Sequence, residues 1–173
     1  ELSLYVAGQK SIQPSLSYGK PVVEGVESTD GIIQNQNADT EGNQLLVIKG
    51  QNFGPAKTNT AFKSNVRLSK SEGINEVVYY PKQCNITQSS TRIECFTPPG
   101  IGQDFKVGVS VEEQDSELGG GEPFGYGKPS ISDVNLDVIN TDVSAQISLS
   151  GENFGLNVKS GFGDPARSVY YKF

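Results

Sequence analysis

The stretch LVIKGQNFG, residues 46–54, decides the fold class of this chain, because an apolar and β-branched run enters a turn bounded by glycines. Such a run is typical of a largely buried strand. Gly50 and Gly54 permit backbone angles with φ > 0, so the chain can leave the strand abruptly while Phe53 turns back into the core. Asn52 suits a local hydrogen bond from its side chain to the backbone. A glycine-rich ligand loop is the alternative, but no helix signal follows the glycines.

A second copy of this turn indicates that the chain is built from repeats. The sequence ISLSGENFG at 147–155 follows the first copy with an offset of 101 residues, and YGKPVVEGV at 18–26 recurs as YGKPSISDV at 126–134 with an offset of 108. Chance is a poor explanation for two separate sequence motifs that recur in the same order. A period of about a hundred residues is typical of a complete β-sandwich domain and too long for a solenoid unit.

Residues between the two copies alternate in polarity or are rich in β-branched and aromatic side chains, with no convincing helical stripe. The clearest runs are Gln44–Lys49, Val66–Ser69, Glu76–Tyr80, Arg92–Phe96 and Phe105–Val111. The sequence therefore predicts an all-β domain of about seven strands. The segment Asp30–Asn43 is polar and rich in Asn and Gln, so it is predicted to be an exposed loop.

The repeat predicts one complete domain flanked by two partial copies. Residues 1–20 are predicted to be the last strand of a preceding domain, 21–128 a complete domain, and 129–173 the first half of a following one. The alternation of Leu2–Val6 resembles that of Phe105–Val111, and each run is followed by Tyr-Gly-Lys-Pro. We expect the chain to be part of a longer polypeptide.

Composition argues against several classes of function. The net charge is −6, from 14 basic and 20 acidic residues, so a nucleic-acid backbone would be repelled. No window approaches eighteen consecutive apolar residues, so no membrane insertion is expected within this segment. The chain contains no His, which removes the commonest general base and every Ser-His or Cys-His arrangement. We therefore predict a protein that is not an enzyme, with no catalytic residues and no cofactor.

Acidic residues leave one alternative open. Glu112, Glu113, Asp115 and Glu117 follow the predicted last strand of the complete domain, and Asp133 and Asp137 lie at the next boundary. Carboxylates of this kind can bind Ca²⁺. Because no spacing of a known calcium loop is present, a solvated charged linker is the preferred interpretation and no metal site is predicted.

Two pairs of tyrosines occur in corresponding predicted strands, Tyr79-Tyr80 and Tyr170-Tyr171. One tyrosine of each pair is predicted to face the core. The outward one is available to stack on a sugar or a protein.

The turn, a cysteine some thirty residues later and the sequence RIECFTPPG at 92–100 together resemble the IPT/TIG domain. This is the immunoglobulin-like fold shared by plexins, transcription factors and many extracellular proteins. The resemblance covers residues 21–128. In residues 129–173 it rests on the turn residues Gly151, Asn153, Phe154 and Gly155. It implies an immunoglobulin-like β-sandwich in which these turn residues have structural roles.

Cys84 and Cys95 lie at the edges of two neighbouring predicted strands, and the resemblance also pairs cysteines at these positions. A disulfide is the preferred interpretation, which requires an oxidising compartment. A metal pair and a catalytic thiol are the alternatives, and each lacks the further ligand or base that it needs. Asn85-Ile86-Thr87 is an N-glycosylation sequon, so an N-linked glycan on Asn85 is predicted.

Together these features predict an extracellular or cell-surface array of domains with a structural or adhesive function, whose partners are neighbouring copies or adjacent domains. Alternatives are the stalk of a plexin-like receptor and a spacer in a secreted carbohydrate-active enzyme; the DNA-binding branch of the family fits the acidic charge least. A further hypothesis is an extracellular filament, in which a neighbouring subunit inserts Leu2, Leu4 and Val6 as the missing last strand of the C-terminal half-domain.

Overall fold

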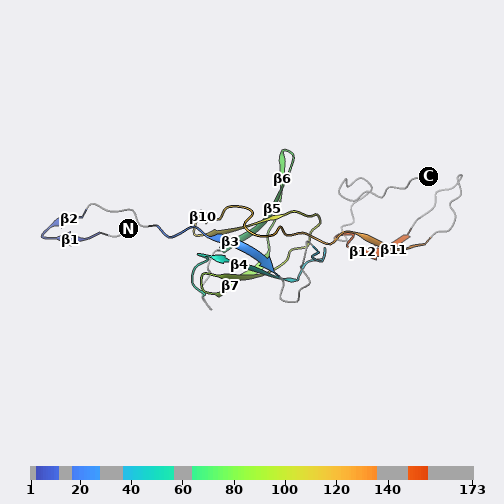
Figure 1. The fold of residues 1–173 in the computed structure, drawn as a ribbon, viewed down its shortest axis with the longest axis horizontal. Helices are drawn as coiled ribbons and strands as arrows, with labels where there is room; N and C mark the ends of the chain where they lie inside the picture. Colours follow the sequence, from blue (N-terminus) through green and yellow to red (C-terminus); the bar gives the residue numbers. More distant parts are fainter. Residues whose placement is uncertain (1–2, 12–16, 28–36, 57–63, 136–147, 156–173) are drawn as a thin grey trace.

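The structure is a computed structural model, and it describes residues 3–11, 17–27, 37–56, 64–135 and 148–155 (Figure 1). All regular secondary structure in these ranges is β. The strands are β1 Tyr5–Val6, β2 Gln9–Lys10, β3 Val22–Glu27, β4 Leu45–Gln51, β5 Ser64–Glu72, β6 Asn75–Tyr79, β7 Lys82–Gln88, β8 Arg92–Phe96, β9 Lys106–Val111, β10 Gln114–Asp115, β11 Ser130–Asn135 and β12 Ser148–Glu152.

Two four-stranded sheets form a β-sandwich between residues 22 and 115, called here the middle sandwich. One sheet has the order β3-β4-β8-β7 and the other β10-β9-β5-β6, and every neighbouring pair is antiparallel. The hairpins β1-β2 and β11-β12 lie outside the sandwich, on either side of it in Figure 1. The immunoglobulin-like fold and the five predicted strand runs are confirmed. The strands β3, β7 and β10 were not among them. β7 was missed because this edge strand is mostly polar and exposed.

The core lies between the two sheets and follows the alternation of each strand. Leu46 and Ile48 of β4 and Ile93 of β8 face Leu68 of β5 and Val107 of β9, and each is at most 2% exposed. The buried rings of Phe53, Phe105, Phe124 and Tyr126 complete this core from the loops and strand ends.

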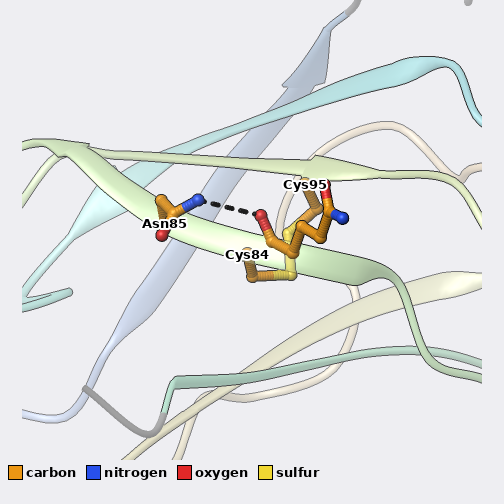
Figure 2. The surroundings of a disulfide bond; sticks show 4 residues. Cys84, Asn85 and Cys95 are labelled. Atoms are coloured by element: carbon orange, nitrogen blue, oxygen red, sulfur yellow. Dashed lines mark hydrogen bonds between the residues drawn. A yellow bond between two sulfur atoms is a disulfide. The ribbon is translucent and has the colours of Figure 1, made fainter. Parts of the chain in front are cut away.

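A disulfide joins Cys84 of β7 to Cys95 of β8, as predicted (Figure 2). Cys95 is fully buried and Cys84 is half-buried against the core. The bond therefore ties β7, which among the described residues has a sheet neighbour on one side only, to the centre of its sheet.

The prediction that Asp30–Asn43 is an exposed loop is wrong for two of the residues that the structure describes. Ala38 is 0% and Thr40 is 3% exposed. The Ala38 amide donates to Gly125 O at 3.0 Å, and the Gly127 amide donates to Ala38 O at 2.7 Å, so the segment pairs with the end of the sandwich. Backbone groups that are paired in this way can be buried at low cost, which the local polarity of the sequence did not indicate. Residues 30–36 lie outside the described ranges.

Candidate functional site

The turn at residues 50–54, called here the first turn, closes one end of the middle sandwich. Phe53 is fully buried, as predicted. Asn52 and Gly54 have φ of 61° and 92°, so the change of direction after β4 is made by left-handed backbone at these two residues. Gly50 has no positive φ, contrary to the prediction, and is needed for a different reason. A Cβ at this position would collide with the carbonyl oxygen of Val22 and lie 2.5 Å from the Phe53 ring.

Asn52 connects the first turn to a remote part of the chain. Its Nδ2 donates a hydrogen bond to Lys20 O at 2.9 Å, 32 residues earlier, so the prediction of a local bond is wrong. Lys20 precedes Pro21, which restricts it to extended backbone and presents its carbonyl to the turn. A Cβ on Gly19 would lie 2.9 Å from the same Nδ2. The repeated Gly-Lys-Pro is therefore packed directly on the asparagine.

The second turn, residues 151–155, has the same geometry. Asn153 and Gly155 have φ of 59° and 81°. Asn153 Nδ2 donates to Lys128 O at 3.2 Å, and a Cβ on Gly127 would lie 2.6 Å from that nitrogen. A Cβ on Gly151 would collide with Ser130 O, as one on Gly50 would with Val22 O.

The strands that lead into the two turns also match in register. β3 pairs with β4 through Val23 and Gly50, and β11 pairs with β12 through Ile131 and Gly151; each pair has its register shift directly after these residues. The exposure differs between the two copies. Phe53 is 0% and its counterpart Phe154 is 40% exposed, because the described residues place no second sheet over β11-β12.

The N-terminal hairpin repeats the last hairpin of the middle sandwich. The Leu4 amide donates a hydrogen bond to Ser11 Oγ at 3.1 Å, and the Ser11 amide donates one to the Leu4 carbonyl oxygen at 2.8 Å. Val109 makes the same two bonds to Ser116, at 3.0 and 2.8 Å. The turns between the paired strands each have two consecutive residues with positive φ.

The residues considered for strand donation lie on this hairpin. Leu4 is 65% exposed, whereas its counterpart Val109 is 2% exposed. Val6 is exposed as well, and Leu2 lies outside the described residues.

Tyr126 was quoted in the sequence only as part of the repeated Tyr-Gly-Lys-Pro, and its role was missed. Its ring is buried edge-on against Tyr79, Phe105 and Phe124, and its hydroxyl donates to Pro98 O at 2.8 Å. The repeat of the tyrosine was the available signal. Tyr18 occupies the same place in the first Tyr-Gly-Lys-Pro and is 93% exposed.

Burial raises the pKa of the Tyr126 phenol above its usual range, and the neighbouring Tyr79 raises this pKa further. The folded protein keeps this proton above about pH 10, where an unfolded tyrosine loses it. The free energy of unfolding is therefore expected to fall as the pH rises above about 10, and Tyr126→Phe is expected to remove this part of the slope. Urea unfolding between pH 8 and pH 11 measures it. Tyr18→Phe is the control, and equal slopes for wild type and Tyr126→Phe would contradict the prediction.

Tyr79 and Tyr80 behave as predicted. Tyr79 packs on Phe105 with ring centroids 5.2 Å apart, and Tyr80 is 64% exposed. The other pair, Tyr170-Tyr171, lies outside the described residues.

Asn85 is exposed on the edge strand β7, beside the disulfide (Figure 2). Its Nδ2 donates to Gln83 O at 3.1 Å. In the described part of the chain β7 pairs with β8 alone, so the sequon lies at an edge of the sheet.

Polar side chains surround a depression beside the first turn. An open depression of about 650 Å³ is lined there by polar side chains that include Lys49 and Thr91. Its Glu24 is bonded to Gln51 and its Arg92 to Glu94, so these charged groups are engaged with neighbours.

In the described ranges, no group of three or more His, Cys, Asp or Glu side chains is placed to hold a metal ion. Glu112 and Glu113 form the turn between β9 and β10, with Asp115 in β10; Asp137 lies outside these ranges. No helix long and apolar enough to cross a membrane occurs in the described part of the chain.

Comparison with known proteins gives one match. The family model described as the IPT/TIG domain matches residues 33–126, which is more than half of the chain. No curated protein and no solved structure gives a significant match.

Proposed function

Since the chain belongs to the IPT/TIG domain family, an immunoglobulin-like and generally non-catalytic module, we propose that it is a segment of a tandem array with a structural or adhesive function. In this proposal residues 1–20 end one domain, residues 21–128 form the next, and residues 129–173 begin a third. The partners are the adjacent domains of the array and further copies of them.

The repeated geometry of the two turns is the observation that carries the proposal. Asn52 and Asn153 each bond the carbonyl of a Lys that precedes Pro, and each ends a strand pair of the same register. The N-terminal hairpin adds a third element, because Leu4 and Val109 make the same pair of bonds to a serine. These likenesses occur at nearly one period, as expected if the same domain recurs along the chain.

We assign the array to the extracellular space or the cell surface. The Cys84–Cys95 disulfide persists in an oxidising compartment, and Asn85 lies exposed in a sequon beside it. An N-linked glycan on Asn85 would cover the free edge of β7, where an unpaired strand otherwise invites pairing with another chain.

Strand donation between separate subunits is the second candidate, and the exposure of Leu4 and Val6 favours it. The sequence of β8 is not repeated in either flanking piece, however, since residues 1–20 and 129–173 contain no cysteine and no Thr-Pro-Pro-Gly. The continuous array needs no other source for that strand and is the better proposal.

Mass measurement on the native material tests the proposal. A covalent chain is expected whose mass, after reduction and removal of N-glycans, is far above the 18.5 kDa of these 173 residues. Enzymatic release of an N-glycan converts its asparagine to aspartate, so the peptide that contains Asn85 is expected to carry this change. A reduced and deglycosylated chain near 18.5 kDa that assembles into filaments would contradict the array and favour strand donation. An unmodified Asn85 in the native material would contradict the glycan.

A further inference from the structure

The connection between the middle sandwich and the β11-β12 hairpin is held from both sides. On the sandwich side Tyr126 is buried, and the Gly127 amide donates to Ala38 O at 2.7 Å. On the other side the next residue, Lys128, accepts the hydrogen bond of Asn153 through its carbonyl. The contacts therefore fall on consecutive residues, and no free residue separates them.

Gly127 is enclosed by two side-chain amides, one from each side. A Cβ on Gly127 would lie 2.6 Å from Asn153 Nδ2 and 3.0 Å from Asn37 Oδ1. Any larger residue would have to displace one of these amides, so the two polar groups can approach the linker only because it is glycine. Gly19 has the same relation to Asn52, whose Nδ2 would be 2.9 Å from its Cβ.

We propose that Asn52 and Asn153 are positioning residues that fix the direction in which each domain follows its predecessor, so that the array is a stiff rod. This inference rests on the proposed tandem array. Each junction is held by three features, together called the clamp: an asparagine at positive φ, a glycine without room for a Cβ, and a lysine whose backbone the following proline keeps extended. All three are present at both junctions.

Asparagine meets two requirements at once in this position. It tolerates left-handed backbone better than most residues other than glycine, and its amide supplies a donor for the lysine carbonyl. Aspartate has nearly the same shape and also tolerates this backbone, but as a carboxylate it has no donor and places negative charge against the carbonyl oxygen. The substitution of Asn by Asp therefore removes the clamp and leaves the turn.

Backbone ¹⁵N relaxation of the 173-residue chain tests the clamp. In the wild type the amides of Gly127 and Lys128, and of Gly19 and Lys20, are expected to have order parameters near the ~0.85 of rigid backbone. Asn153→Asp is expected to lower the value at Lys128 below about 0.6, and Asn52→Asp that at Lys20. Each variant is expected to leave the other junction unchanged. Asn43→Asp is the matched control, because Asn43 also has positive φ, at 63°, and lies at neither junction.

Equal order parameters in wild type and in both variants would overturn the clamp, as would low values at Lys20 and Lys128 in the wild type. A general loss of dispersion in the spectrum would reveal unfolding, and Asn153→Gly and Asn52→Gly, which keep the left-handed backbone, would then replace the aspartate variants with the same expected result. The native mass decides the array by itself, so a failure of the clamp and a failure of the array give different observations.

Discussion

Phe53→Ala is expected to destabilise the middle sandwich by about 3–5 kcal/mol, the range found for buried aromatic residues that are truncated to alanine. The ring is 0% exposed and belongs to the same buried cluster as Val23, Ile48 and Ile93. Its removal leaves a cavity that the surrounding sheet cannot close, because β3 and β4 are held against each other at Gly50. Urea unfolding followed by far-ultraviolet circular dichroism measures the loss.

Phe154→Ala is the matched control for this prediction. Phe154 occupies the same place in the second turn, but it is 40% exposed, so its truncation is expected to change the unfolding of the middle sandwich by less than about 0.5 kcal/mol. A Phe53→Ala protein as stable as the wild type would contradict the assignment of Phe53 to the core.

Removal of the disulfide is expected to have the next largest effect. The double variant Cys84→Ala, Cys95→Ala is expected to lose about 2–5 kcal/mol of unfolding free energy. The two cysteines are 11 residues apart, for which the chain-entropy account alone predicts about 3 kcal/mol. The loss also reflects the position of β7, which has register shifts on both sides of Asn85 and Ile86 and, in the ranges that the structure describes, no second sheet neighbour.

Reductant provides the control for the disulfide. Reduced wild-type protein is expected to unfold at a urea concentration close to that of the double variant, and reductant is expected to leave the double variant unchanged. If the oxidised wild type and the double variant share one midpoint, the bond contributes nothing and the prediction is wrong.

Local sequence was enough to predict five of the eight strands of the middle sandwich, and the burial of Phe53. Strand alternation and the demands of a tight turn act over a few residues, so LVIKGQNFG and RIECF contain their own signals. The disulfide was also predictable, since its two cysteines are close in sequence and lie on neighbouring strands.

The candidate site was less predictable, because its contacts join segments far apart in the chain. The repeated words drew attention to Asn52 and Lys20 separately, but nothing local indicates that one bonds the other across 32 residues. Gly50 was predicted to allow a positive φ, because the sequence does not show that the carbonyl that excludes a Cβ there belongs to Val22 on another strand.

The sequence by itself therefore determined the all-β class and five of the strands, because these follow from short-range pattern, and its resemblance to the IPT/TIG domain implied the family and supported the cysteine pair. Only the tertiary structure decided that Ala38 and Thr40 are buried, that Tyr126 closes the core through Pro98, and that asparagines hold the Gly-Lys-Pro linkers. The physical reason is the same in each case. Whether a polar or small residue is buried or hydrogen-bonded depends on which backbone groups from distant parts of the chain the fold places beside it. The local sequence of a polar segment is the same in either case, so it cannot indicate the outcome.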